Sequence, residues 1–255
     1  MRYRILGPLQ VAGARGLSAV SAPKVGRLLA ALLIRADRIV SREELVRELW
    51  PADPPRRATA ALHVHVSQLR KLLRRSGGGD PIGTEAPGYV LRTEPGELDL
   101  HVFQQRVGDG RRHARAQQHE DAARSLRSAL AMCQSPPLPG LGGGPIADGF
   151  VRWFGDVRAE CAEAAVESSI RLGRHHEATE LLRSMLDAYP LREGFYRQLM
   201  LTMHRSGRRA EALAVYQHAR RVIKQELGLE PCQALRDLER TVLSAGENGA
   251  PARAG

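Results

Sequence analysis

A ten-residue pattern that recurs after 34 residues is the feature that most limits how this chain can fold. Residues 173–182 (GlyArgHisHisGluAlaThrGluLeuLeu) have a counterpart at 207–216, and both segments begin with Gly-Arg. A weaker copy lies at 118–126. A period of 34 residues is typical of tetratricopeptide repeats, in which each pair of helices buries its apolar face only by stacking on its neighbours. The repeat therefore predicts helical hairpins for the second half of the chain.

Side-chain size within the repeat supports the same prediction. Ala178 and Ala212 occupy matching positions, and small residues there allow paired helices to approach closely. We expect larger apolar side chains to fill the space between the helices: Leu181, Leu182, Leu199 and Leu213.

A second helix is predicted at residues 58–75, which contain no Gly or Pro for eighteen residues. Pro54-Pro55 and the GlyGlyGly run at 77–79 bracket it, and both are helix-breaking signals. At about 100° per residue, four apolar side chains form one narrow stripe. This stripe consists of Leu62, Val66, Leu69 and Leu73.

The opposite face of this predicted helix has the composition that a major-groove helix requires. It runs from small residues through a methyl-bearing side chain and an amide to cations: Ala60, Ala61, Val64, Gln68, Lys71 and Arg75, flanked by His63, Ser67, Arg70 and Arg74. Such a face permits close approach, reads bases and binds phosphates. An ordinary amphipathic surface helix is the alternative interpretation of this stretch taken alone.

The segments around this helix complete a helix-turn-helix pattern. A strand is predicted over Tyr3–Val11, interrupted at Gly7-Pro8, with a weak second strand near 17–20. Helix 24–36 follows, with Val25, Leu28, Leu29, Leu32 and Leu33 as its buried stripe. Ser41 and Glu44 then form a capping box for another helix, whose inward side chains are Leu45, Val46, Leu49 and Trp50.

Two β-rich runs follow the basic helix, at 82–84 and 88–93, separated by Ala86-Pro87-Gly88. Short β runs around a Pro-Gly turn predict a hairpin. A hairpin directly after the third helix of such a unit is the wing of a winged helix.

Charge is concentrated in the same part of the chain. The formal net charge is +10, and residues 1–95 hold 16 Lys and Arg against 8 Asp and Glu. The remaining 160 residues are almost balanced, with 22 against 20. A polyanionic partner is therefore expected to bind the N-terminal third.

The first third of the chain resembles the winged-helix output domain of OmpR-type response regulators. The resemblance lies in Val64–Leu73 (ValHisValSerGlnLeuArgLysLeuLeu), in Ser41–Trp50 and in Ile82 with Gly88-Tyr89. It implies that the third helix enters the major groove and that the hairpin reaches the adjacent minor groove. The residue after Gly-Tyr is often a minor-groove arginine in relatives but is Val90 here, so Arg92 or Thr93 is expected to replace it.

The second half resembles the bacterial transcriptional activator domain, through Tyr189–Glu193, Ser206–Leu213, Tyr216 and Glu226–Pro231. The two domains together are the pair found in the SARP family, the Streptomyces antibiotic regulatory proteins. That resemblance implies binding to direct repeats near the −35 region of antibiotic or secondary-metabolite promoters. It also implies contact with RNA polymerase holoenzyme (sigma factor and core subunits) and a homodimer, at least on DNA.

The residues themselves suggest no catalytic or metal site, so we expect neither an enzyme nor a cofactor. His63 and His65 lie roughly 200° apart around a helix and cannot chelate one metal ion; we expect one at the groove flank and one packed on a neighbouring helix. Gly140–Gly144 lacks the Lys-Ser/Thr and the preceding strand of a phosphate loop. Three cysteines without a C-x-x-C pair indicate neither a disulfide framework nor zinc.

Together these features predict a mainly α protein with a small β component. We expect a winged helix-turn-helix at 1–95, an all-α tetratricopeptide-like domain at 96–245 and a disordered tail at 246–255, with an irregular loop at 133–150. The predicted function is sequence-specific, double-stranded DNA binding by a transcriptional activator in the cytoplasm, associated with the nucleoid and not with a membrane. The alternative is a helical-repeat scaffold that binds nucleic acid, or RNA, without sequence specificity.

The predicted DNA contacts fall into two groups. The recognition helix contributes His63, Val64, Ser67, Gln68, Arg70, Lys71, Arg74 and Arg75. Gln68 suits adenine, Val64 a thymine methyl and Lys71 guanine or phosphate, whereas the arginines suit phosphates. For Arg74 and Arg75, a solubilising helix C-terminus is the alternative. The wing and the approach to the helix contribute Arg56, Arg57, Thr59, Tyr89, Arg92 and Thr93.

Overall fold

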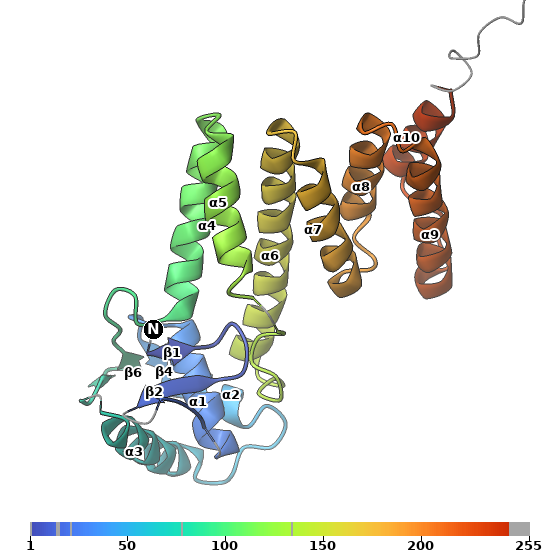
Figure 1. The fold of residues 1–255 in the computed structure, drawn as a ribbon. Helices are drawn as coiled ribbons and strands as arrows, with labels where there is room; N and C mark the ends of the chain where they lie inside the picture. The colour runs from blue at the N-terminus through green and yellow to red at the C-terminus, as the bar shows by residue number, and fades with distance from the viewer. Residues whose placement is uncertain (1, 14–15, 21, 78, 134, 245–255) are drawn as a thin grey trace, which may run out of the picture. The chain divides into compact units, whose positions relative to one another are not determined.

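The computed structural model describes residues 2–13, 16–20, 22–77, 79–133 and 135–244, and the protein is mainly helical with two small sheets (Figure 1). It forms two compact units. The first comprises residues 1–108 and 128–158, and the second comprises residues 109–127 and 159–255. The predicted disordered tail, residues 246–255, lies outside the described residues. The division into domains at 95 and 96 stays a prediction.

The first unit begins with an antiparallel sheet in the order β1-β2-β3, formed by β1 (Tyr3–Arg4), β2 (Gln10–Gly13) and β3 (Gly16–Ala19). The prediction of one interrupted strand over residues 3–11 was wrong. Tyr3 pairs with Val11, so the chain reverses between them. Gly7-Pro8 lies in that reversal, which suits a residue pair that supplies backbone freedom and lacks one N–H donor.

Three helices form the core of the winged helix: α1 (Pro23–Ile34), α2 (Arg42–Leu49) and α3 (Ala58–Arg75). The predicted stripes of α1 and α3 are buried. The predicted capping box of α2 is present, because the Glu44 N–H donates to Ser41 Oγ at 3.1 Å and the Ser41 N–H donates to Glu44 Oε2 at 2.9 Å. Leu45 and Leu49 are buried, whereas Val46 and Trp50 are only half-buried.

The predicted wing is a hairpin of β5 (Ile82–Glu85) and β6 (Gly88–Leu91). A two-residue strand that was not predicted, β4 (Val40–Ser41), pairs with β6 and joins the wing to the start of α2. A Cβ at Gly88 would lie 1.8 Å from the Val40 carbonyl oxygen, so this close approach of two strands requires glycine.

Two buried carboxylates attach further helices to the first unit. Asp99, at the start of α4 (Asp99–Arg115), accepts hydrogen bonds from the N–H groups of Ile5 and Leu6. Glu48 of α2 accepts from the N–H groups of Ile146 at 2.6 Å and Ala147 at 3.1 Å. The bonds to Glu48 satisfy free donors at a helix N-terminus.

Those bonds mark the start of α6 (Pro145–Arg171), so the predicted loop at 133–150 was wrong for residues 145–150, which are helical. Helix begins at Pro145, a favoured first residue of helices because it has no N–H to satisfy. The aromatic rings of Phe150 and Phe154 pack together with centroids 5.7 Å apart. The ring of Phe103 in α4 also contacts that of Phe154, with ring centroids 5.1 Å apart.

The second unit contains the predicted helical hairpins. Its helices include part of α5 (His119–Leu130), then α7 (His175–Ala188), α8 (Glu193–Arg205), α9 (Arg209–Leu227) and α10 (Gln233–Ser244), and α8 packs between α7 and α9 (Figure 1). Ala178 and Ala212 are both fully buried at matching positions, as predicted. Leu182 and Leu199 are buried, and Leu181 and Leu213 are half-buried.

Each repeat begins with the same backbone turn. Gly173 and Gly207 have φ values of 72° and 73°, and each stands two residues before a helix. Gln117 stands two residues before α5 with a φ of 60°. The weak copy at 118–126 therefore has the geometry of the other two without their glycine.

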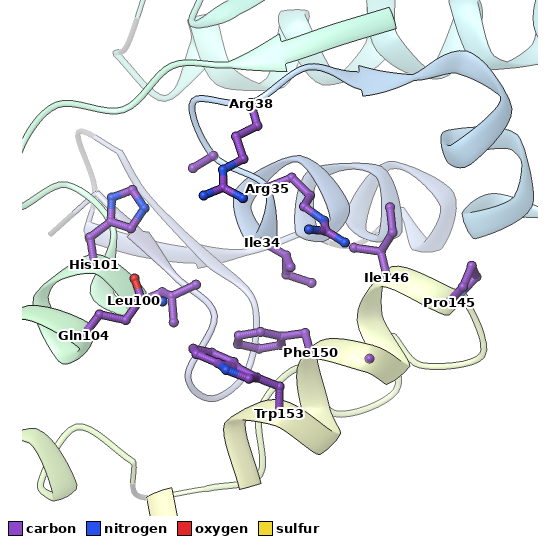
Figure 2. Close-up of a pocket in the computed structure, with 12 residues that line it drawn as sticks. Ile34, Arg35, Arg38, Leu100, His101, Gln104, Pro145, Ile146, Phe150 and Trp153 are labelled. Atoms are coloured by element: carbon purple, nitrogen blue, oxygen red, sulfur yellow. The ribbon is translucent and has the colours of Figure 1, made fainter. Parts of the chain in front are cut away.

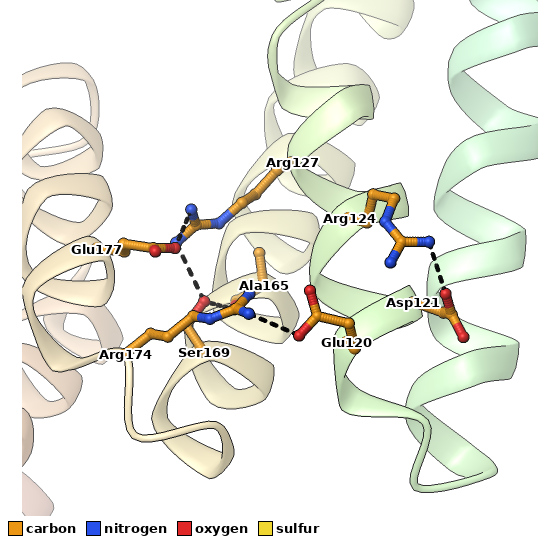
Figure 3. Close-up of polar contacts among 8 residues, drawn as sticks. All are labelled: Glu120, Asp121, Arg124, Arg127, Ala165, Ser169, Arg174 and Glu177. Carbon is orange, nitrogen blue, oxygen red and sulfur yellow. Dashed lines mark hydrogen bonds and ion pairs between the residues drawn. The ribbon is translucent and has the colours of Figure 1, made fainter.

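Polar side chains link α5, α6 and α7 within the second unit (Figure 3). Arg127 forms an ion pair with Glu177 and donates to Ser169 Oγ at 3.2 Å. Arg174 forms an ion pair with Glu120 at 2.7 Å. An apolar cluster joins α8, α9 and α10: Tyr196, Met200, Tyr216, Ala219, Ile223 and Leu235.

Candidate nucleic-acid interface

The two faces of α3 differ as predicted from the sequence. Its apolar stripe lies in the core, with Leu62, Leu69 and Leu73 fully buried. On the outer face, Val64 is 55% exposed, although valine is normally an interior residue. Ser67, Gln68 and Lys71 are also exposed and surround the next turns. The outer face thus presents one large apolar side chain, with Ala60 and Ala61 before it and polar and cationic groups after it.

A groove of about 430 Å³ lies between α3 and the wing. Its lining comes from the start of α2, from α3 and from both wing strands: Arg42, His63, Val66, Ser67, Arg70, Lys71, Arg74, Thr84 and Tyr89. The lining contains four Arg and Lys side chains and no carboxylate. Arg70 and Arg74 form ion pairs with Asp80, so Arg42 and Lys71 supply the excess positive charge that favours an anionic partner.

Arg70 connects the recognition helix to the wing. Its Nη2 donates to the Ile82 carbonyl oxygen at 2.8 Å and to Thr84 Oγ1 at 2.9 Å. Its Nε lies 3.4 Å from Asp80 Oδ1. The guanidinium is therefore engaged within the protein, and its geometric role is to hold β5 against α3.

Three other predicted contact residues are also engaged. Arg74 forms an ion pair with Asp80 at 3.0 Å. Arg92 pairs with Glu85 at 2.9 Å, and both of these arginines remain about 60% exposed. Thr93 donates from its N–H and its hydroxyl to Asp37, each at 3.0 Å. Thr93 is thus bonded to the loop after α1, and neither it nor Arg92 lines the groove.

The two histidines of α3 point in different directions, and His65 packs on a neighbouring helix as predicted, whereas a place for His63 at the flank of a DNA groove stays a prediction. His63 lines the groove and meets the Tyr89 ring edge-on, with ring centroids 6.5 Å apart. His65 packs against Trp50 at the end of α2, with ring centroids 5.8 Å apart. Its Nδ1 also lies 3.2 Å from Gln68 Oε1, so the amide that was predicted to read adenine has a neighbour that orients it.

Val90 is 1% exposed and belongs to the core. Its side chain cannot replace the minor-groove arginine of OmpR-type relatives. Tyr89 is only 4% exposed and contributes one side of the groove. The exposed residues at the tip of the wing are Ala86 and Pro87, which carry no charge.

The remaining predicted residues lie at the two ends of α3. Arg56, Arg57 and Thr59 lie at its N-terminal end and do not line the groove. Arg75 is exposed at its C-terminal end. These side chains frame the outer face of the helix.

Arg42 is the groove residue that sequence reasoning missed. It follows the N-cap Ser41 as the first residue of α2, and its backbone N–H donates to the Pro87 carbonyl oxygen of the wing at 3.3 Å. The sequence feature that could have identified Arg42 is its position directly after the N-cap residue Ser41. The backbone N–H groups of Arg42 and Glu44 are bonded within the protein, so at this helix start the Arg42 side chain is the group that can meet an anion.

Fold and groove define a class of protein: a winged helix with a cationic face, continued by tetratricopeptide-like helical repeats. Family models agree, since residues 19–91 match the "Transcriptional regulatory protein, C terminal" model and residues 98–243 match the "Bacterial transcriptional activator domain" model. The chain belongs to the SARP family of transcriptional regulators. Members of this family are regulators and not enzymes.

Several transcriptional regulators align with nearly the whole of this chain. The regulatory protein DnrI of Streptomyces peucetius is 30% identical over 96% of the chain and 93% of its own length. AfsR of Streptomyces griseus is 33% identical over 97% of the chain, which spans about 25% of that longer protein. The structure of Mycobacterium tuberculosis EmbR in complex with a low-affinity phosphopeptide superposes with a TM-score of 0.85, at 29% identity, over 95% of this chain and 65% of that one.

None of the helices within the described residues is long and apolar enough to cross a bilayer.

Proposed function

We propose that this chain is a sequence-specific DNA-binding transcriptional activator, with α3 in the major groove of its target. The observation that carries the proposal is the exposed Val64 in the middle of a helix face that begins with small residues and ends with polar and cationic ones. An isolated valine at 55% exposure has no packing role, whereas a thymine methyl group offers it an apolar contact.

Base reading is proposed for the middle of the outer face. Gln68 hydrogen-bonds adenine, Lys71 binds guanine or phosphate, and His63 and Ser67 contact the groove edge. Phosphate contacts are proposed for the flanking cations, which set affinity without selecting sequence. These comprise Arg42, Arg56, Arg57, Arg74 and Arg75, with Thr59 beside them.

The wing has a different proposed role from the helix. Arg70 is bonded to Ile82 and Thr84, so it contributes by holding the wing in place more than by contacting phosphate. Arg92 reaches the minor groove only by exchanging its Glu85 partner for DNA. Thr93 and Tyr89 support the wing through their contacts with Asp37 and His63.

Family membership supports the proposed targets and partners. We propose direct repeats near the −35 region of promoters in antibiotic or secondary-metabolite gene clusters, bound by a homodimer that recruits RNA polymerase through sigma and core subunits. In this proposal, residues 1–95 bind DNA and residues 96–245 mediate subunit and polymerase contacts. Such a protein acts in the cytoplasm, at the nucleoid.

Footprinting on the promoters of the protein's own gene cluster tests the proposal. We expect protection of paired short repeats, which Val64→Ala and Gln68→Ala weaken or abolish. Val151→Ala and Gln105→Ala make the same chemical changes at exposed positions of α6 and α4 and should leave the footprint intact. Equal affinity for random duplex of the same length would favour the non-specific scaffold instead.

Salt dependence separates phosphate contacts from other roles. Arg75→Ala should weaken binding to every sequence and reduce the slope of log K against log salt by about 0.9 for each phosphate that the arginine neutralises. Arg74→Ala should do the same if Arg74 leaves Asp80 for DNA, and an unchanged slope would leave it a solubilising residue. Arg70→Ala should also lower the thermal stability of the free protein, which Arg75→Ala should not.

A further inference from the structure

A second pocket in the first unit, of about 550 Å³, shares no residue with the groove beside α3. It is formed by the end of α1 with the loop that follows, by the first turns of α4 and by the first turns of α6 (Figure 2). Its volume lies within the range of about 300–1,000 Å³ that is typical of small-molecule sites. The proposed DNA-binding function does not account for it.

One side of this pocket is polar and cationic. Figure 2 shows the guanidinium groups of Arg35 and Arg38 directed toward the cavity, with His101 to one side and Gln104 near Leu100. No carboxylate belongs to the lining. Within the described part of the chain, neither arginine forms an ion pair within 4.0 Å. The charge of Arg35 also lowers the pKa of Glu44. Two guanidinium groups that face one cavity without a close ion pair favour a carboxylate or phosphate.

The opposite side is aromatic and apolar. The rings of Phe150 and Trp153 lie with centroids 6.0 Å apart and planes inclined by 35°. Phe150 is buried, but Trp153 is 40% exposed at the pocket. Ile34, Leu100 and Ile146 complete this side. An exposed tryptophan beside a buried phenylalanine offers a planar ring a stacking surface.

Gly149 preserves the open space between the two sides. It lies in the second turn of α6 and lines the pocket, and a Cβ built there would meet no atom within 4 Å. Glycine in a helix is about 1 kcal/mol less favourable than alanine, so neither packing nor helix stability explains it. An absent side chain at this position leaves room for a ligand.

We infer that this pocket binds a small aromatic anion, with a fused or single planar ring against Phe150 and Trp153 and its carboxylate or phosphate between Arg35 and Arg38. The two guanidinium groups are the reason to expect an anionic group in the ligand, and the aromatic side of the pocket is the reason to expect a planar ring. His101 and Gln104 supply further hydrogen-bonding groups at the edge of the anion. The site is separate from α3 and does not depend on the proposed DNA binding.

Isothermal titration calorimetry on the full chain tests the inference with 2-naphthoate and 2-naphthyl phosphate as probes. We expect saturable binding of at least one probe and at least tenfold weaker binding of the neutral 2-naphthamide. Arg38→Gln should weaken the anionic probe at least tenfold. Arg152→Gln removes the same charge from the neighbouring surface of α6, outside the lining, and should change affinity less than twofold.

The glycine provides a steric test within the same helix. Gly149→Leu should fill the cavity and abolish binding, whereas Gly149→Ala should retain it within about threefold, and circular dichroism would establish that both variants are folded. Absence of saturable binding by both probes at millimolar concentration would overturn the inference. So would equal affinity for 2-naphthamide, or equal losses in Arg38→Gln and Arg152→Gln.

Discussion

The bond between Glu48 and the start of α6 gives a quantitative test of how the first unit is held together. Glu48 is 1% exposed, and its two carboxylate oxygens accept the N–H groups of Ile146 and Ala147. Glu48→Ala removes both acceptors and leaves two buried donors without partners. We expect a loss of stability, even though burial raises the pKa of this carboxyl and so opposes its ionised form.

The size of the loss follows from these contacts. Hydrogen bonds to charged groups contribute about 1.5–3 kcal/mol each, so two give roughly 3–6 kcal/mol. The cost of burying the ionised carboxylate offsets part of this gain, which leaves a net expectation of about 2–4 kcal/mol. For a unit of this size, 1 kcal/mol shifts the melting temperature by roughly 2–4 °C, so a decrease of about 4–16 °C is expected in calorimetry.

Gly144 offers an independent perturbation of the same contact. A Cβ at Gly144 would lie 2.4 Å from Glu48 Cδ and 2.5 Å from both carboxylate oxygens. Gly144→Ala should therefore displace the carboxylate and destabilise the unit by about 1–3 kcal/mol. In the Glu48→Ala background the same methyl group meets a vacated space, so the double variant should be at least about 1 kcal/mol more stable than the sum predicts.

The matched control is Gly149→Ala, five residues after Gly144 and within α6, where an added Cβ would meet no atom within 4 Å. It should be neutral or stabilising by up to about 1 kcal/mol because alanine favours the helix. Effects of Glu48→Ala and Gly144→Ala that add to within about 0.5 kcal/mol would refute the reasoning, since they would indicate that the two positions do not share a contact.

Further predictions concern the capping box of α2, the ion pair between Arg127 and Glu177, and the buried stripe of α3. Hydrogen bonds from Ser41 lower the pKa of Glu44 below its ordinary 4.5, so its contribution to stability is present above pH 4.5 and is lost as the pH falls through the lowered pKa. The difference in melting temperature between the wild type and Glu44→Gln should therefore shrink below pH 4.5, and a constant difference would contradict this assignment. Arg127→Met keeps the aliphatic stem but removes the ion pair with Glu177, and chemical denaturation should show a loss of about 0.5–1 kcal/mol that decreases in high salt. Leu69→Ala in the buried stripe of α3 should cost about 2–5 kcal/mol, and a loss below about 1 kcal/mol would show that this helix is not packed as described.

The features predicted best from the sequence are those that depend on residues only a few positions apart. The stripe of α3 and the capping box of Ser41 and Glu44 depend on helical spacing and on a contact three residues long, and both were confirmed. The hairpin at β5 and β6 was predicted from its Pro-Gly turn. Gln117 shows the limit of pattern matching, because its left-handed turn repeats the geometry of Gly173 and Gly207 without their residue type.

Features that depend on distant partners were not predicted. The Gly- and Pro-rich approach to α6 suggests a loop, whereas the carboxylate that satisfies the N-terminus of this helix lies 98 residues upstream, at Glu48. Strand β4 is two residues long and exists only because β6 lies beside it. The engagement of Arg70 with Ile82 and Thr84 likewise required the fold, since an arginine on an outer helix face looks the same in sequence whether it is free or bonded.

The matched turns at Gln117, Gly173 and Gly207 have a consequence for how proteins of this plan change length. Gly173 and Gly207 stand at the same place relative to the helix that follows, so a hairpin inserted between these two turns would begin and end with the same backbone turn. In such stacks each repeat contacts only its neighbours. The part of the chain after α6 can therefore grow or shrink in steps of one hairpin during evolution, without any change in the residues of the winged helix.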